Sequence, residues 1–434
     1  MDKKLIRRVI ICIVIIMIII IGYLIKIMHQ HKEEDKMYDD SESIPIEELI
    51  KVDPQNRNID RISYFDIDSC MNRYLSTIDT NNFIYQGREE SQIKESIYNI
   101  LSESYIKQNN ITKDNVYNFV KTKSESTLYV PLEISVIQQS NIKSFLVHGL
   151  LENFDLQVTD EIFVVVNIDI TNNLFSIEPI YGNYNSINEI KIEKSEDTIK
   201  NNENNVFTSV PATYENIAKD YINIYKRLAL GRPKIMYNLL NEEYREKRFG
   251  SEQEFEKYIT SNKDRILGTR LEKYQTISEN GIQYVCVDQY DNYYIFNEND
   301  VMDYTVLLDQ HTIDLAGFTE KYNSARNENK VAMNIEKIKD AINTNDYKYI
   351  YDKLDATFRQ NNFSTEAELE KYLKDNLYEM NNFEYTNINE QNGLYIFSLL
   401  VGDNIGHATS VRNMNIVMQL KEGTDFVMSF SIEK

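Results

Sequence analysis

The side chains of this sequence that could do acid–base or metal chemistry are few and widely spaced. Its five histidines are His29, His31, His148, His311 and His407. None of them stands in the HExxH spacing that turns two imidazoles toward one zinc ion. His148 and His407 could each serve as an isolated base in a pocket, but a core or solvated histidine is the more common case. His311 lies in an expected turn.

The sequence also gives little evidence for a catalytic nucleophile or a cation-binding loop. No Gly-x-Ser-x-Gly turn or phosphate-binding loop occurs, and Cys286 is expected to be a small core residue on a strand. One region is rich in oxygen ligands: Asp288, Asp291, Asn297, Glu298, Asp300 and Asp303. Such residues can hold Ca²⁺, but their spacing matches no calcium loop and they are also common turn formers. We therefore predict no catalytic, cofactor-binding or metal site, and no enzyme.

An apolar run near the N-terminus predicts a membrane-spanning helix. Residues 9–25 read VIICIVIIMIIIIGYLI and contain no charged residue. A spanning helix needs about 20 residues. Because the Lys26 side chain can extend to the interface, we place the span at residues 9–28. A cleaved signal peptide would need a shorter run and a small-residue cleavage site, which the following KIMHQHKEED does not provide. The lipid bilayer is thus the partner expected for this segment.

The charges that flank the span predict its orientation. Lys3, Lys4, Arg7 and Arg8 precede it, and acidic residues outnumber basic ones in the segment that follows. An excess of Lys and Arg stays in the cytoplasm. We therefore expect a cytoplasmic tail at residues 1–8, a single pass through the cell membrane, a flexible acidic spacer at 29–60 and an extracellular C-terminus.

The composition narrows the class of protein further. The net charge of −21 disfavours binding to phosphate backbones, so we expect no nucleic-acid partner. Outside the apolar run the cysteines are Cys70 and Cys286, which lie in different repeats, so the chain has no disulfide framework. The lack of such a framework fits a bacterial surface protein, and the abundant Ile, Asn, Lys and Tyr with no Trp are typical of an AT-rich, low-GC bacterium.

Comparing the sequence with itself reveals a block that occurs three times. Residues 236–259 align without a gap to residues 350–373, and residues 97–120 form a fainter third copy. The matches between the first two include Tyr237 with Tyr351, Leu240 with Leu354, Arg245 with Arg359, and Phe249 with Phe363. Such identical spacing predicts three copies of one domain.

Each copy is expected to place helices before strands. Tyr237, Leu240 and Tyr244 share one helix face, because they are spaced i, i+3 and i+7. Ser251-x-x-Glu254 and Thr365-x-x-Glu368 are capping boxes that open a second helix, and Thr112-x-x-Asn115 keeps only the cap. A longer helix precedes each block, and β-rich runs follow it. Each copy is expected to close with a hairpin, whose turns are Asn172-Asn173, Gln310-His311 and Glu422-Gly423.

The predicted fold class is therefore α+β, with an N-terminal transmembrane helix and three tandem units of helices followed by an antiparallel sheet of about four strands. The expected segments are repeat 1 at 61–182, a linker and best hinge at 183–209, repeat 2 at 210–320 and repeat 3 at 321–434.

This order of elements resembles the nuclear transport factor two-like, or cystatin-like, fold, in which a curved sheet and helices form a cone. The whole layout of tail, span, linker and tandem domains is similar to that of assembly factors of type IV secretion and Gram-positive conjugation systems, and equally to uncharacterised Firmicute membrane proteins. The resemblance implies scaffold proteins that associate with themselves and recruit other subunits. Three units instead of one or two is a departure from that layout.

Two functions remain in view from the sequence, and an enzyme of the fold's isomerase or dehydratase type has no candidate residues. The first is a membrane-anchored extracytoplasmic binding or scaffold protein, possessing a protein partner or associating with itself, in a conjugation or secretion assembly. The second is an extracytoplasmic sensor or small-ligand binder, which would need an open, polar-lined cone pocket in one repeat.

Overall fold

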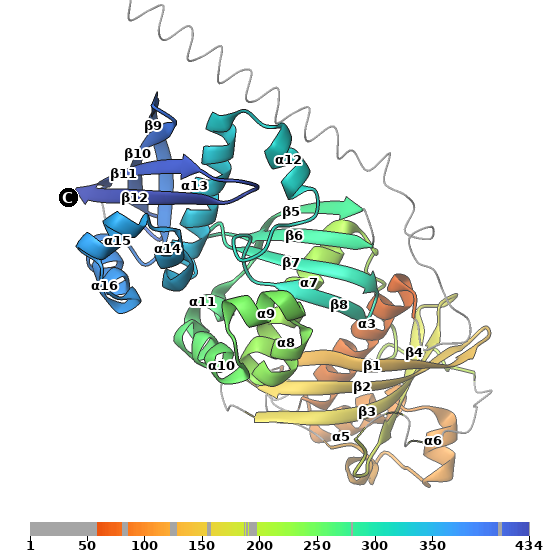
Figure 1. Cartoon of the computed structure of the whole chain (residues 1–434). Helices are drawn as coiled ribbons and strands as arrows, with labels where there is room; N and C mark the ends of the chain where they lie inside the picture. The colour runs from red at the N-terminus through yellow and green to blue at the C-terminus, as the bar shows by residue number, and fades with distance from the viewer. Residues whose placement is uncertain are drawn as a thin grey trace, which may run out of the picture. The chain divides into compact units, whose positions relative to one another are not determined.

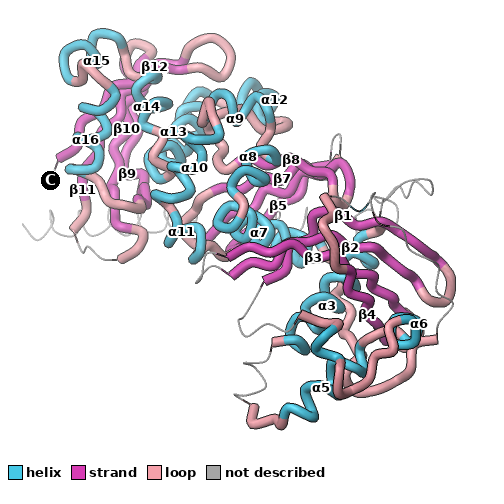
Figure 2. The backbone as a smooth tube through the Cα atoms, turned by 90° about the horizontal axis from the view of Figure 1, so that it is seen from below, coloured by secondary structure: helices cyan, strands magenta, loops and turns pink. Residues whose placement is uncertain are grey.

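Three antiparallel sheets, each preceded by helices, make up the described part of the chain (Figure 1). The structure is a computed structural model that describes residues 59–79, 86–121, 128–153, 158–185, 187, 190, 198–278, 281–406 and 410–433. Each sheet has four strands in sequential order, so the predicted α+β class is confirmed for these residues. Figure 2 shows the same alternation of helix groups and sheets from below.

The elements of the three repeats follow one order. Repeat 1 contains α3 (Arg61–Ile78), α5 (Glu90–Ile100), α6 (Glu103–Gln108), η1 (Val116–Asn118), β1 (Leu128–Gln139), β2 (Lys143–Asn153), β3 (Val158–Asp169) and β4 (Leu174–Ile180). Repeat 2 contains α7 (Tyr214–Gly231), α8 (Pro233–Leu239), α9 (Glu242–Arg248), α10 (Glu252–Ser261), α11 (Lys263–Gly268), β5 (Leu271–Ser278), β6 (Ile282–Asp288), β7 (Tyr293–Asp300) and β8 (Asp303–Leu307). Repeat 3 contains α12 (Phe318–Ser324), α13 (Asn327–Asn343), α14 (Tyr347–Lys353), α15 (Ala356–Asn362), α16 (Glu366–Asn376), β9 (Asn381–Gln391), β10 (Leu394–Asp403), β11 (Arg412–Leu420) and β12 (Phe426–Glu433).

One contact recurs in all three repeats and explains why the sequence block repeats. A leucine at the C-cap of the helix that follows the long one (α5, α8 and α14) forms a parallel bridge with the last strand of its sheet. The pairs are Leu101 with Ile177, Leu240 with Val306, and Leu354 with Met428. The residue after each leucine donates its N–H to the same strand and caps the next helix: Ser102, Asn241 and Asp355. The block therefore fastens the helices to the sheet edge.

The predicted caps are present. Ser251 and Thr365 accept the backbone N–H of Glu254 and Glu368, at the starts of α10 and α16. In repeat 1, Thr112 and Asn115 bond each other reciprocally, Asn115 N to Thr112 Oγ1 at 3.3 Å and Thr112 N to Asn115 Oδ1 at 2.7 Å. An amide oxygen thus does there what the glutamate of a full capping box does.

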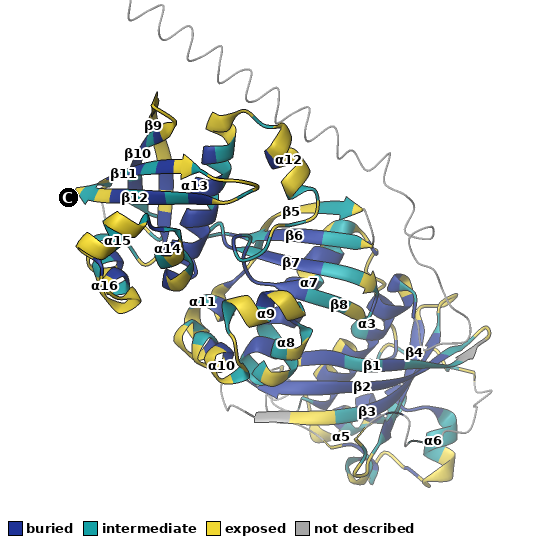
Figure 3. Cartoon of the chain, viewed as in Figure 1, coloured by how far each residue is buried: buried dark blue, intermediate teal, exposed yellow. Residues whose placement is uncertain are grey.

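The core of each repeat lies between the long helix and the sheet (Figure 3). Helix α3 contacts β1 and β3, and α13 contacts β9. Helix α7 contacts β5 and β6 of its own repeat and also β1 and β2 of repeat 1. Repeats 1 and 2 are therefore packed together through α7.

The closing hairpin expected for repeat 2 is wrong. Gln310 and His311 do not join two strands, because the last hairpin is β7–β8, which turns near Met302. The Asp309 carboxylate accepts the backbone N–H groups of His311 and Thr312, at 3.2 and 3.0 Å, and this turn leads the chain out of the sheet. In repeats 1 and 3 the predicted hairpins are confirmed as β3–β4 and β11–β12.

The expected linker covers residues 183–209. The described residues near its C-terminal end are bound to repeat 1. Val206 forms an antiparallel bridge with Leu174 at the start of β4, and Phe207 N donates to Asn173 O at 3.1 Å. The Phe207 side chain is buried. The expectation of a hinge low in core residues therefore fails for this stretch.

The expected tail and span, and the spacer up to residue 58, lie outside the described residues. Among the residues that the structure does describe, no helix combines the length and the apolar character needed to cross a bilayer.

Candidate functional site

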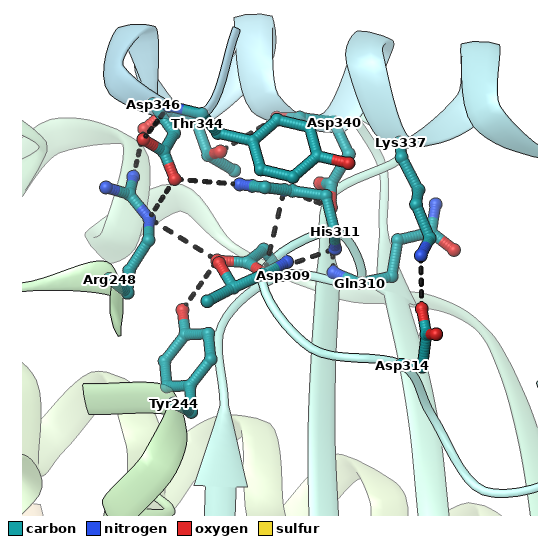
Figure 4. Close-up of polar contacts among 12 residues, drawn as sticks. Tyr244, Arg248, Asp309, Gln310, His311, Asp314, Lys337, Asp340, Thr344 and Asp346 are labelled. Carbon is teal, nitrogen blue, oxygen red and sulfur yellow. Dashed lines mark hydrogen bonds and ion pairs between the residues drawn. The ribbon is translucent and has the colours of Figure 1, made fainter. Parts of the chain in front are cut away.

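A buried charge cluster lies where repeats 2 and 3 meet (Figure 4). We call it the His311 cluster, and it consists of Tyr244, Arg248, Asp309, His311, Asp340 and Asp346. Four of these residues belong to repeat 2: Tyr244 and Arg248 are on α9, and Asp309 and His311 are in the turn after β8. Asp340 is on α13 of repeat 3, and Asp346 is the N-cap of α14.

The imidazole of His311 is held between carboxylates. Nδ1 is 3.0 Å from Asp340 Oδ2 and 3.6 Å from Asp309 Oδ1, and Nε2 is 3.0 Å from Asp346 Oδ2. Both ring nitrogens can donate at once only in the imidazolium form. Burial alone would lower the pKa of His311, but the charge of Asp309 and the hydrogen bonds to Asp340 and Asp346 outweigh it and raise the pKa to about 10. The ring is therefore a buried cation at neutral pH.

Arg248 supplies the second cation of the cluster. Its Nε lies 3.3 Å from Asp346 Oδ2, and its Nη2 donates to the carbonyl of Thr344 at 2.9 Å. Arg265 of α11 donates to the carbonyl of Asn343 at 2.9 Å. The last carbonyls of a helix lack partners within the helix and carry partial negative charge, so two arginines of repeat 2 complete the C-terminal end of α13.

The carboxylate of Asp309 is saturated by protein donors. Its Oδ1 accepts two backbone N–H groups, and its Oδ2 accepts Tyr244 OH at 2.7 Å and Thr312 Oγ1 at 3.0 Å. Arg248 Nε is 3.4 Å from the same oxygen. Asp309 therefore holds the conformation of the turn that carries His311, and it also connects this turn to α9.

Three of these residues could also be considered as metal ligands. One donor atom each from Asp309, His311 and Asp340 lies within 4.8 Å of the others, and a carboxylate on the second nitrogen of a ligating histidine is a common support. However, the Asp309 oxygen of this set already accepts two N–H groups, and Asp340 Oδ2 accepts Gln310 N at 2.7 Å. These hydrogen bonds fit a proton on His311 better than a metal ion.

A second buried ion pair joins repeats 1 and 2. Arg61, the first residue of α3, places Nη2 2.6 Å from Glu298 Oε2 of β7 and 3.2 Å from Tyr221 OH of α7. Tyr221 OH donates to the same glutamate oxygen at 2.5 Å. The Tyr221 ring also stacks on Phe296, with centroids 4.7 Å apart. The first helix of repeat 1 is thereby connected to the sheet of repeat 2.

Arg61→Met should lower the free energy of unfolding of the chain by about 2–3 kcal/mol, because it leaves the Glu298 carboxylate without its cation while keeping most of the apolar stem. Urea unfolding measures this. Arg73→Met is the matched control on the same helix, since the bond of Arg73 among the described residues is an exposed one to the backbone carbonyl of Glu203. Equal effects of the two substitutions would contradict the importance of the ion pair.

Two residues of the acidic region singled out in the sequence have protein partners. Asp288 is fully buried and accepts the N–H groups of Tyr290 and Asn292 and the Asn292 amide, so it builds the β6–β7 turn. Glu298 belongs to the ion pair with Arg61. The two acids have different partners because they stand at opposite ends of the β6–β7 pair: Asp288 is the last residue of β6, whereas Glu298 pairs with Ile282 at the start of β6.

The remaining flagged residues have ordinary surroundings where they are described. His148 is buried on β2, stacks on Phe163 with centroids 4.2 Å apart, and lies 3.3 Å from Glu161 Oε2. Cys286 is a core residue as predicted, and burial raises the pKa of its thiol to about 12. His29, His31 and His407 lie outside the described residues.

No protein-family model matches this chain, and no curated protein is similar to it in sequence.

The charged side chains of the two junctions are buried or nearly so. The His311 side chain is 0 % exposed and Arg61 is 2 % exposed, so neither cluster offers its charge to a substrate in this arrangement. What these charges do is bind one repeat to the next.

Proposed function

We propose that this protein is a membrane-anchored extracytoplasmic scaffold without catalytic activity, held by residues 9–28, whose repeats bind a protein partner or a second copy of the chain. In its most specific form, the proposal places the protein in a conjugation or secretion assembly. The tail at residues 1–8 would then be cytoplasmic and the C-terminus extracellular.

The observation that carries the proposal is that the charged groups of the junctions are used between repeats. Two arginines and a histidine of repeat 2 bind the end of α13 and the cap of α14, and Arg61 binds Glu298 across the other junction. A scaffold needs its modules at fixed positions, because a partner that contacts two modules gains affinity only when their spacing suits it.

The filled interior of repeat 3 also supports a binding role over catalysis in that repeat. Enzymes of cone-like folds need open space between helix and sheet, and side chains occupy this space here. The buried residues that fill it include Val331, Ile335 and Ile338 from α13 and Met414, Ile416 and Met418 from β11.

Sedimentation equilibrium at several concentrations tests the proposal. A fragment of residues 59–434 suits the measurement, because it omits the expected span and keeps Asp60, whose carboxylate caps α3 through Ser63 N at 2.8 Å. Discrete dimers or trimers that grow with concentration are expected for a self-associating scaffold. A strict monomer at all concentrations would count against self-association.

A second candidate function, small-ligand binding, is favoured by one pocket of about 240 Å³ in repeat 1. The pocket lies beside α6 and the segment 198–205, and its walls include Leu101, Ile106 and Ile199. Glu103, in the same lining, is paired with Lys107 and Lys200. A monomeric ectodomain that binds a small molecule here would be a sensor or binding protein, although this is not the cone pocket that the sequence led us to expect.

A further inference from the structure

An acidic side chain is buried without a hydrogen-bond donor at the junction of repeats 1 and 2. Glu152, near the end of β2, is 1 % exposed, and neither carboxylate oxygen has a hydrogen-bond partner among the described residues. The carboxylate lies directly against Gly231, the last residue of α7, so that a Cβ at this glycine would overlap it. The acid belongs to repeat 1 and the glycine to repeat 2.

The two arginines whose charges act on Glu152 make no hydrogen bond to it, and Arg232 Nε also has no hydrogen-bond partner among the described residues. Arg227 of α7 donates to the backbone carbonyl of Tyr129 on β1. Arg232, which follows Gly231, places Nη2 3.8 Å from Glu161 Oε1 on β3. Glu161 in turn faces His148 Nε2 at 3.3 Å. Burial raises the pKa of Glu152 to about 7, against the opposing charges of Arg232 and Arg227.

We propose that Glu152 makes the joint between repeats 1 and 2 sensitive to pH, closed when the carboxyl is protonated and looser when it is ionised. A neutral carboxyl can be buried against a glycine at modest cost, whereas a carboxylate without donors pays a large desolvation cost that opening the joint relieves.

The sign follows from proton binding. The closed joint binds the proton more tightly than the open joint, so the closed form loses stability as pH rises from the ordinary glutamate pKa of 4.5 to the raised value of about 7. A role for this response at the outer surface of a cell rests on the proposed extracytoplasmic location. The joint itself can be tested without that assumption.

Hydrogen exchange of the full chain in detergent, at pH 6 and pH 8 and corrected for intrinsic exchange rates, tests the proposal. Amides of α7 and β2 should exchange about tenfold faster at pH 8, given the two pKa values. Glu152→Gln should reduce this difference in the amides of β2 and the end of α7, since the amide is an uncharged isostere; the part that depends on Asp68 of α3, whose pKa is raised to about 7 by burial and by Asp220 of α7, should remain. Glu161→Gln, which removes the partly exposed partner of Arg232, should keep the whole difference. Equal protection of the wild type at both pH values, or a difference that is as large in Glu152→Gln as in the wild type, would overturn the proposal.

A pair of glycine substitutions tests the packing independently. Gly231→Ala places a methyl group in the space of the Glu152 carboxylate and should accelerate exchange at the joint at both pH values. Gly268→Ala is the matched control, because this glycine is also the last residue of a helix and has no atom within 4 Å of an added Cβ. An unchanged joint in Gly231→Ala would contradict the close packing of Glu152 on which the pH response depends.

Discussion

Asp346→Ala is expected to lower the free energy of unfolding of repeats 2 and 3 by about 3–5 kcal/mol, because it removes the nearer of the two carboxylates that the buried cations Arg248 and His311 share. His311 Nε2 and Arg248 Nε lie 3.0 and 3.3 Å from Asp346 Oδ2. The substitution also removes the cap of α14, where Asp346 Oδ1 accepts Tyr349 N at 3.1 Å, a loss of about 1 kcal/mol within that total. Urea unfolding of the wild type and the variant gives the difference.

The matched control for this prediction is Asp352→Ala. Asp352 is on α14 itself, and its salt bridge with Lys348 is exposed, so its removal should change stability by less than about 0.5 kcal/mol. Asp346→Asn separates the two roles of the side chain, since asparagine retains the cap and loses the charge. If Asp346→Ala cost no more than Asp352→Ala, the His311 cluster would not hold the junction together.

The second large effect is a loss of stability in mildly alkaline solution. The pKa of His311 is raised from 6.5 to about 10 in the folded chain, so folding is favoured by proton binding. This contribution is complete below pH 6.5 and is lost as pH rises through about 10. Between pH 6 and pH 9 the loss should be on the order of 3 kcal/mol.

Urea unfolding at a series of pH values measures this decline. His311→Phe should be less stable than the wild type at pH 6 and should lack the part of the decline that lies between pH 7 and pH 9. The matched control is His148→Phe, which replaces the other buried histidine of the described residues and should retain the decline. A wild-type stability that stays flat from pH 7 to pH 9 would show that His311 is not protonated in its cluster.

The fold was predictable from the sequence to the extent that local signals repeat. The caps at Ser251 and Thr365 and the β-rich runs correspond to elements found in the structure. The single helix expected over Tyr237, Leu240 and Tyr244 is wrong, because α8 ends at Leu239, Leu240 has an extended backbone and α9 begins at Glu242. The bridge made by Leu240 explains why this position recurs in all three blocks. Such features depend on neighbours within one repeat, and periodicity therefore reveals them.

The His311 cluster was not predictable in the same way. Its members come from two repeats and are separated by up to about a hundred positions, from Tyr244 to Asp346, so no spacing rule joins them. The one local signal was Asp309 followed by Thr312, which indicates a side-chain-capped turn instead of a hairpin. Taking Gln310-His311 as a strand connection directed the histidine to solvent, whereas the turn directs it into the junction.

Glu298 and Asp288 are grouped as possible cation ligands because they are close in the sequence, but the structure gives them different partners. Their crowding in the sequence suggested loops rich in cation ligands, but one faces Arg61 and the other closes a turn. Asp288 and Glu298 have unrelated partners because the length of the β6–β7 pair separates them, with Glu298 opposite Ile282 and Asp288 at the other end of β6. Composition alone could not distinguish these roles.

Hydrogen exchange at increasing urea, which reports each repeat separately, tests most directly whether the junctions make repeats 2 and 3 one cooperative body. We expect the amides of α7, β6, α13 and β11 to lose protection at a single urea midpoint in the wild type, and at two midpoints in Asp346→Ala. Separate midpoints for repeats 2 and 3 in the wild type would contradict the account, because the repeats would then unfold independently despite the buried charges between them.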